Sequence, residues 1–117
     1  MKEFLAIYRG TSAALDHWKS MDEATRRQRE GAGRRAWSEW MKLHEQDVVD
    51  PGTPIGKTKR VSAQGISDVK NEIGAYVIVQ AETQEDAAKL FENHPHFTIF
   101  PGDSVEIMEC LPMPRIQ

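Results

Sequence analysis

Two short segments of the chain are apolar at every position, and they constrain the fold more than any other feature. They cover residues 4–8 and 75–79. Successive side chains of a β-strand point to opposite faces of its sheet, so both faces of a sheet containing these segments are apolar. A sheet with one face in water alternates apolar and polar residues instead. We therefore expect helices to cover one face and a second copy of the chain to cover the other, as a homodimer.

The elements expected along the chain follow the order of a ferredoxin-like α+β domain. Alternation, helical spacing and turn residues predict a strand, a long helix, two strands, a second helix and a last strand. These elements cover residues 4–8, 22–48, 57–62, 73–81, 83–93 and 104–111, and residues 113–115 form a tail. Asp22 and Thr83 are the expected N-caps of the two helices. The order predicts an antiparallel sheet with both helices on one face. The 117 residues suffice for a single domain, residues 1–117, but not for two.

The long helix has the least regular sequence of these elements. Its apolar face is formed by residues three or four positions apart: Gly33, Trp37, Trp40, Met41, His44 and Val48. Gly31 and Gly33 weaken its middle, so it either kinks there or begins in earnest only at Arg34. Two prolines and a glycine within residues 50–54 must end it. Residues 63–72 are expected to form a loop before the central strand.

The charge balance argues against nucleic acid and a membrane surface as partners. The net charge is −3, so no overall field attracts polyanions. A local basic cluster is nevertheless present, formed by Arg26, Arg27, Arg29, Arg34 and Arg35. Acidic residues stand four positions before three of these arginines, a spacing that supports an exposed helix. A solvated helix face therefore explains the cluster better than a nucleic-acid patch does.

The ends of the chain and its cysteine content predict a cytoplasmic protein. The N-terminal residues run straight into a strand-like segment, without the apolar core of a signal peptide. No apolar stretch approaches the length of a membrane span. Cys110 is the single cysteine and has no partner for an internal disulfide. We expect it to be an inert, partly buried thiol.

Four segments together resemble the YCII-related family, including its DGPF branch. They are IGAYVIVQAET at residues 73–83, EDA at 85–87, HPHF at 94–97 and GDSVEI at 102–107. The resemblance implies a ferredoxin-like subunit that pairs into a dimeric α/β barrel. It implies little about chemistry, because most members lack an assigned activity. Dehydrochlorination of an aromatic ring belongs to isolated relatives.

Family members proposed to be enzymes carry a histidine on the first helix and an aspartate shortly after it, a pair suited to acid-base catalysis. This chain departs from that pattern. The position of the helix histidine is Trp37, and no aspartate matches near Lys57. The stretch that gives the DGPF branch its name reads AQGI at residues 63–66. The resemblance therefore does not supply a catalytic pair.

The histidines are the candidates for catalysis. His44 lies on the apolar helix face one turn from Trp40, where it is either a general base or a hydrogen-bonded residue at the core edge. His94 and His96 would point the same way on an extended segment and could then bind a metal, but zinc needs further ligands. A pocket-lining or buried role for His96 fits better. We take His44 and His96 as catalytic candidates and expect no metal.

Aromatic residues are the candidates for ligand binding. Six of them could line a pocket for a flat or apolar ligand or simply pack the core: Tyr8, Trp18, Trp37, Trp40, Tyr76 and Phe97. We select Tyr8, Trp40 and Tyr76. If the strand registers allow, Tyr8 and Tyr76 share the face away from the helices.

Two functions remain compatible with the sequence. The first is a YCII-related protein of unassigned activity that binds or transforms a small molecule without a cofactor, in a pocket between the sheet and the first long helix. The second is a non-catalytic dimeric interaction or regulatory module. A catalytic site should bring a titratable group and a polar partner together in a concave pocket. Scattered, exposed histidines would favour the second function.

Overall fold

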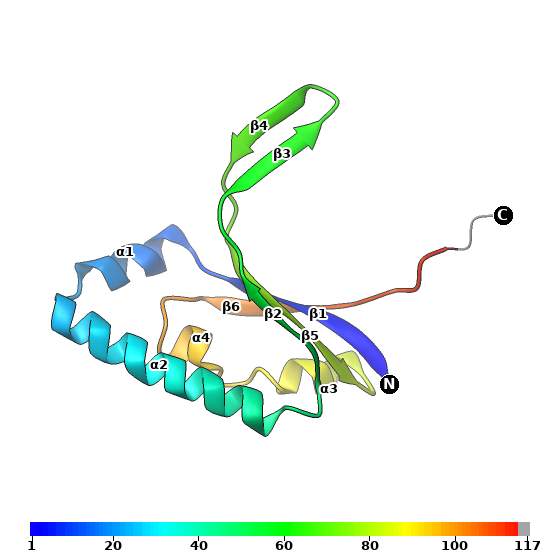
Figure 1. Cartoon of the computed structure of the whole chain (residues 1–117), viewed down its shortest axis with the longest axis horizontal. Coiled ribbons are helices and arrows are strands. Elements are labelled where there is room, and N and C mark those ends of the chain that lie inside the picture. The colour runs from blue at the N-terminus through cyan, green and yellow to red at the C-terminus, as the bar shows by residue number, and fades with distance from the viewer. Residues whose placement is uncertain (115–117) are drawn as a thin grey trace.

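The structure, a computed structural model, describes residues 1–114, so the end of the expected tail at residues 113–115 lies outside the described residues. Its main sheet has four antiparallel strands in the order β2-β5-β1-β6 (Figure 1). They are β1 (Lys2–Arg9), β2 (Val48–Pro54), β5 (Ile73–Ala81) and β6 (Ser104–Glu109). The two wholly apolar segments lie in the central strands, β1 and β5. The expected α+β class is confirmed, and the topology is consistent with a ferredoxin-like fold.

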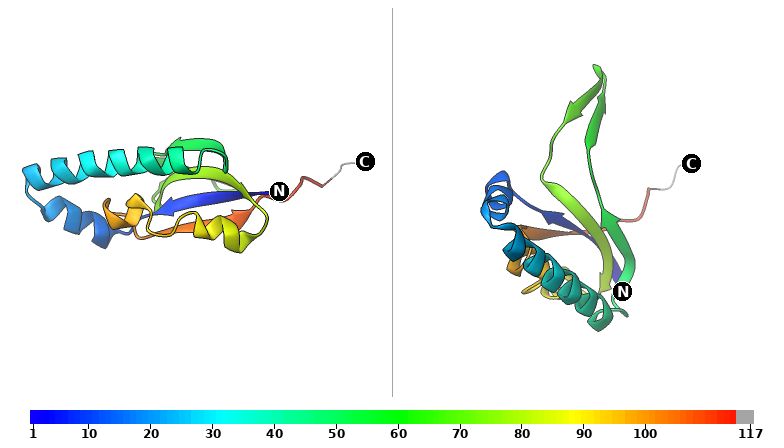
Figure 2. Two further views of the ribbon diagram at one scale, coloured as in Figure 1. Left: turned by 90° about the horizontal axis from the view of Figure 1, so that it is seen from below. Right: turned by 60° about the vertical axis from the view of Figure 1, so that its left-hand side comes forward.

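The helices cover one face of this sheet (Figure 2). They are α1 (Ser12–Ser20), α2 (Glu23–Leu43), α3 (Gln84–Lys89) and α4 (Pro95–Thr98). The core between the layers is formed by inward residues of β1 and β5 and by residues of the helical side: Phe4, Ala6, Tyr8, Trp40, Val77, Val79, Ala81, Ala87 and Phe91. Each large apolar side chain buried there stabilises the fold by roughly 1.5–3 kcal/mol.

The opposite face of the sheet has no helix over it within residues 1–114 (Figure 2). Leu5 and Ile7 of β1 and Tyr76 and Ile78 of β5 alternate with the buried residues, so they point to this open face, where they are only half-buried. Met108 of β6 pairs with Leu5 and is 40% exposed. A single chain therefore leaves apolar side chains on this face, and pairing with a second copy stays a prediction.

Helix α2 runs without a break through Gly31 and Gly33. The expected kink or late start at Arg34 is therefore not seen. It begins after Asp22, whose side chain accepts a hydrogen bond from the Thr25 backbone N–H at 3.2 Å. Gly33 is required by packing, because a Cβ there would lie 2.5 Å from the Phe100 ring. The helix ends at Leu43 rather than at Val48, which already belongs to β2.

Strand β2 is the element that the sequence analysis missed most clearly, because residues 50–54 were expected only to end the long helix. They pair with β5 at the sheet edge, with two register shifts. An edge strand tolerates proline because one row of its N–H groups needs no partner. Gly52 has a φ of 66° and lies so close to β5 that a Cβ would overlap the Tyr76 carbonyl oxygen. The second strand of the sheet is therefore β2 and not residues 57–62.

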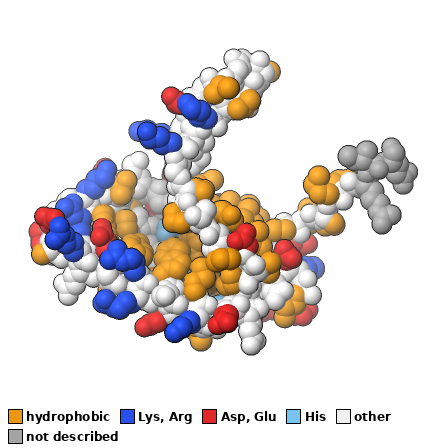
Figure 3. All heavy atoms as spheres, viewed as in Figure 1, with side chains coloured by type: hydrophobic (Ala, Val, Ile, Leu, Met, Phe, Trp, Pro, Cys, Tyr) orange, Lys and Arg blue, Asp and Glu red, His pale blue; other side chains and the backbone are white. Residues whose placement is uncertain are grey.

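The segment between β2 and β5 forms a separate two-stranded hairpin, β3 (Thr58–Ser62) and β4 (Gly65–Val69). The strand at residues 57–62 is confirmed, but the loop expected at residues 63–72 is wrong, since half of it forms β4. The hairpin projects away from the helices (Figure 1). Apolar side chains gather over the strands at its base and reappear at its tip (Figure 3).

The C-terminal third of the chain follows the prediction with shorter elements. Thr83 caps α3 by accepting a hydrogen bond from the Asp86 backbone N–H at 3.1 Å, as expected. The helix ends at Lys89 rather than Asn93, and α4 follows after a turn. Strand β6 ends at Glu109 instead of residue 111. Cys110 is exposed rather than partly buried.

Candidate functional site

Aromatic and histidine rings gather where the C-terminal half of β1 meets α2 and α4. We call this group the Tyr8 cluster: Tyr8, Trp37, Trp40, Phe91, His94 and His96. The Tyr8 ring centroid lies 4.9 Å from that of Trp37 and 5.0 Å from those of both His94 and His96. Figure 3 shows histidine surface among apolar side chains, between the helices and the base of the hairpin. The cluster therefore combines two imidazoles with a partly accessible apolar surface.

Local sequence explains why two histidines enter this cluster. His94 is the N-cap of α4, and Pro95 occupies the first turn, where its missing N–H costs nothing. The His94 Nδ1 accepts a hydrogen bond from the His96 backbone N–H at 3.0 Å. The segment is thus a helix start and not the extended strand on which both rings would point toward a metal. Among residues 1–114, no group of three or more His, Cys, Asp or Glu side chains could hold a metal ion.

The hydrogen bonds of His94 define which of its nitrogens carries the proton. Burial lowers the pKa of His94 to about 3, so the ring is neutral at pH 7. Because Nδ1 is an acceptor, the proton lies on Nε2, which donates to the Tyr8 hydroxyl at 3.1 Å. Burial also raises the pKa of Tyr8, which therefore remains a neutral phenol. Sequence reasoning left His94 out of the site, although its N-cap position before proline is a readable signal.

His96 has a different arrangement, which leaves one nitrogen available. Its Nε2 lies 2.7 Å from the Arg9 carbonyl oxygen, which can only accept, so Nε2 carries the proton. Burial lowers the pKa of His96, while the Arg9 and Ser104 carbonyls and the Asp103 charge act in the opposite direction. In the neutral ring, a proton on Nε2 leaves Nδ1 unprotonated. The half-buried ring therefore presents an unprotonated nitrogen suited to accept a proton.

The other catalytic candidate, His44, lies at the far end of α2 as its C-cap residue. Its ring packs 4.9 Å from Trp40, and its Nδ1 lies 3.8 Å from an Asp47 carboxylate oxygen. The Trp40 ring also packs 4.7 Å from His94, and its N–H donates to the Leu90 carbonyl at 2.8 Å. Trp40 thus lies between His44 and the remaining cluster, and His44 is held as a residue at the core edge.

The hypothesis that Tyr8 and Tyr76 share the face away from the helices is wrong. Tyr8 is 1% exposed and packs under the helices against Trp37. The strand register pairs Tyr76 with Ile7 and not with Tyr8, so Tyr76 points to the open face. Side chains alternate between the two faces along a strand, so the offset of one residue between Tyr8 and the partner of Tyr76 places the two tyrosines on opposite faces of the sheet. Ligand contacts by Tyr8, Trp40 and Tyr76 stay predictions.

A shallow hollow of about 320 Å³ borders the Tyr8 cluster between α3, α4 and β6. Phe91 belongs both to its wall and to the cluster. Most of its lining is apolar, and its polar members include Asp103 and Ser104, which also influence His96. This hollow can accept an apolar ring with a polar substituent.

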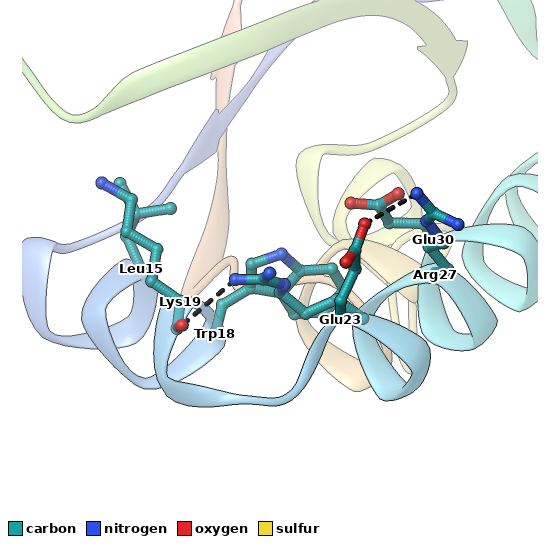
Figure 4. A pocket seen from close by; sticks show the side chains of 7 residues that line it. Leu15, Trp18, Lys19, Glu23, Arg27 and Glu30 are labelled. Atoms are coloured by element: carbon teal, nitrogen blue, oxygen red, sulfur yellow. Dashed lines mark hydrogen bonds and ion pairs between the residues drawn. The ribbon is translucent and has the colours of Figure 1, made fainter.

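A second hollow, of about 350 Å³, lies at the elbow between α1 and α2 (Figure 4). It is lined by Leu15, Trp18, Lys19, Glu23, Arg26, Arg27 and Glu30. Arg27 pairs with Glu23 at 2.7 Å, and Arg26 donates to the Lys19 carbonyl at 3.1 Å. Arg27 is thus paired on its own helix, as expected for a solvated helix face, whereas Arg26 bonds a backbone carbonyl of α1. No histidine lines the hollow.

Fold and site together define a class: an α+β protein with one helix-covered sheet face and a histidine-containing aromatic cluster beneath the helices. No family model matches the chain, and no curated protein matches it in sequence. Among the residues described, no helix is both long enough and apolar enough to cross a membrane.

One similar solved structure is that of 5-chloro-2-hydroxyhydroquinone dehydrochlorinase from Burkholderia phenoliruptrix AC1100, in complex with 2,5-dihydroxybenzoquinone. The match covers 90% of this chain and 89% of that chain, with a TM-score of 0.52. The sequences are 13% identical. At this identity the likeness shows a shared fold.

Proposed function

We propose that the chain is a YCII-related, homodimeric α/β-barrel protein that binds a small ring compound without a cofactor and removes a proton from it. His96 is the general base. The observation that supports this proposal is its neutral imidazole, held by the Arg9 carbonyl through Nε2 while Nδ1 is unprotonated. A positioned base with a pKa near or below the working pH is suited to abstract a proton.

The surroundings of His96 favour the charged ring that proton abstraction creates. When Nδ1 accepts a proton, the imidazolium gains from the two carbonyl oxygens and the Asp103 carboxylate that already act on its pKa. Tyr8 packs edge-on at 5.0 Å and keeps the ring in place. The buried Tyr8 side chain bonds His94 and packs on His96, so it orients both rings.

Two further observations support this proposal. The structural neighbour is a dehydrochlorinase of a hydroxylated ring, and its complex contains 2,5-dihydroxybenzoquinone. Hydroxyl groups on a ring of this type carry acidic protons, which a base can remove. The open apolar face of the sheet is the surface through which two copies would pair.

The test uses hydroquinone and 2,5-dihydroxybenzoquinone as probes, with NMR of the histidine side chains and titration calorimetry. We expect both probes to shift the His96 resonances and His96→Gln to weaken binding at least about tenfold, the effect of losing roughly 1.4 kcal/mol. His44→Gln is the matched variant and should leave binding unchanged. If His44→Gln abolishes binding instead, the base is His44. If neither probe moves any histidine resonance, the non-catalytic interaction module becomes the better description.

A further inference from the structure

The β3–β4 hairpin has no surface of its own chain on which to rest. Its strands pair with each other in a separate sheet and make no extensive contact with another element within residues 1–114. It projects from the rest of the chain in Figure 1 and in the right view of Figure 2. An isolated two-stranded hairpin is marginally stable in water. A well-formed hairpin without support therefore calls for a partner surface.

The hairpin carries an apolar pair that this partner would cover. Val61 and Ile66 lie directly opposite each other near the tip and are 77% and 71% exposed. Lys59 and Asp68 form an ion pair two positions further along the same face. Cross-strand pairs of this type stabilise a hairpin only modestly. Their exposure is better explained by an apolar contact outside the chain.

Charge indicates what the partner is. Residues 57–70 contain four Lys or Arg and one Asp, a net charge of +3, whereas the remainder of the chain has 11 Lys or Arg and 17 Asp or Glu, a net charge of −6. A basic hairpin and an acidic remainder attract each other between two copies. Glu3 also stands beside Leu5 on the open face, whereas the Glu106 carboxylate beside Ile7 is already paired with Arg9 at 2.8 Å.

The position of the hairpin agrees with this partner. β3 and β4 continue from β2 and β5, and β5 contributes Tyr76 and Ile78 to the open face. A second copy on that face lies next to the base of the hairpin. A strand of five residues extends about 16 Å at ~3.3 Å per residue, enough to lie along a partner subunit. Two-fold symmetry then gives each copy the hairpin of the other.

We propose that residues 57–70 form an arm that packs Val61 and Ile66 on the second copy of the chain and contacts its acidic surface through Lys59 and Arg60. This inference rests on the homodimer of the proposed function. It adds a contact outside the sheet face to that dimer. The arm and the open face are separate parts of one interface.

The test measures the dimer dissociation constant by sedimentation equilibrium of the full chain. Val61→Ser/Ile66→Ser should raise it at least about tenfold, and Lys59→Glu/Arg60→Glu should do so at low salt and less at high salt. Ser20→Ala, in α1 and outside the hairpin and the open face, is the control and should have no effect. Circular dichroism should show the same fold for all variants. Ile7→Lys, in the centre of the open face, tests the sheet contact separately.

The outcomes separate the arm from the dimer itself. If the wild type is a dimer that Ile7→Lys dissociates while both arm variants associate like the wild type, the sheet-face dimer stands and the arm is overturned. If the wild type is a monomer, both proposals fail. If that monomer binds nucleic acid and Lys59→Glu/Arg60→Glu abolishes the binding, the occupant of the arm is a polyanion rather than a second copy. A dimer weakened by both arm variants supports the arm.

Discussion

Valine is buried on the helix-covered face of the sheet but exposed on the β3–β4 hairpin. Val77 and Val79 of β5 are fully buried, whereas Val61 of β3 is 77% exposed. All three lie in antiparallel strands, so strand formation does not explain the difference. The face under α2 closes a core within one chain, and the hairpin does not. The chain thus buries its own apolar residues under α2 and leaves apolar surface for a partner on the hairpin.

The largest expected effect comes from replacing Gly52, which packs directly against the backbone of β5. Gly52→Ala places a Cβ against the Tyr76 carbonyl at a φ of 66°, so we expect a loss of about 3 kcal/mol or more in the free energy of unfolding. Gly56→Ala, at the base of the hairpin with open space around it, should change stability by less than about 0.5 kcal/mol. Urea unfolding measures both. Equal losses of unfolding free energy for the two variants would contradict the contrast between the four-stranded sheet and the hairpin.

Low pH should lower the free energy of unfolding because His94 is buried as a neutral ring. Its pKa is lowered from 6.5 to about 3, so between these values the unfolded chain binds a proton that the folded chain does not. The free energy of unfolding therefore falls as pH falls from 6.5 toward 3, by up to about 1.4 kcal/mol per pH unit. His94→Gln should flatten this slope, whatever its effect on stability at pH 7. Parallel profiles for the two proteins would show that His94 is not a buried neutral ring.

The two glycines of α2 provide a sharper test of helix packing. Gly33→Ala should cost roughly 1–3 kcal/mol, because its Cβ would meet the Phe100 ring at 2.5 Å. At Gly31 the nearest atom is the flexible end of Arg35 at 3.6 Å, so Gly31→Ala should stabilise by about 0.5–1 kcal/mol. Thermal unfolding gives the sign of each change. Two stabilising substitutions would mean that Phe100 does not pack on the helix.

The smallest effect is expected on the hairpin. Lys59 and Asp68 form an ion pair whose side chains are 69% and 84% exposed. Exposed pairs contribute little, so Lys59→Ala should change the unfolding free energy of the isolated subunit by less than about 0.5 kcal/mol. The measurement is made at protein concentrations below the dimer dissociation constant, so that the subunit is monomeric. A larger loss there would mean that the hairpin supports the fold of its own chain.

Local sequence signals predicted the parts of the molecule that depend on neighbouring residues. The central strand at residues 73–81 has the predicted bounds, because its apolar run is bounded by polar residues on both sides. The caps at Asp22 and Thr83 form as predicted, since each side chain bonds a backbone group three residues away. The α+β class follows from these elements and their order.

Long-range pairing decided what local signals could not. Residues 50–54 contain turn-forming residues, yet they form a strand because the edge of β5 offers backbone partners and Gly52 allows close approach. The helix-side position of Tyr8 depends on a register that a shift of one residue would reverse.

The candidate site divides in the same way. His44 and His96 are visible in the sequence as histidines beside apolar residues. The bond between Tyr8 and His94 joins residues 86 positions apart, which no local pattern predicts. By itself the sequence determined the central strands, the caps and the presence of imidazoles. The tertiary structure alone decided which ring is buried and which keeps a free nitrogen, because burial and hydrogen-bond partners come from segments distant in the chain.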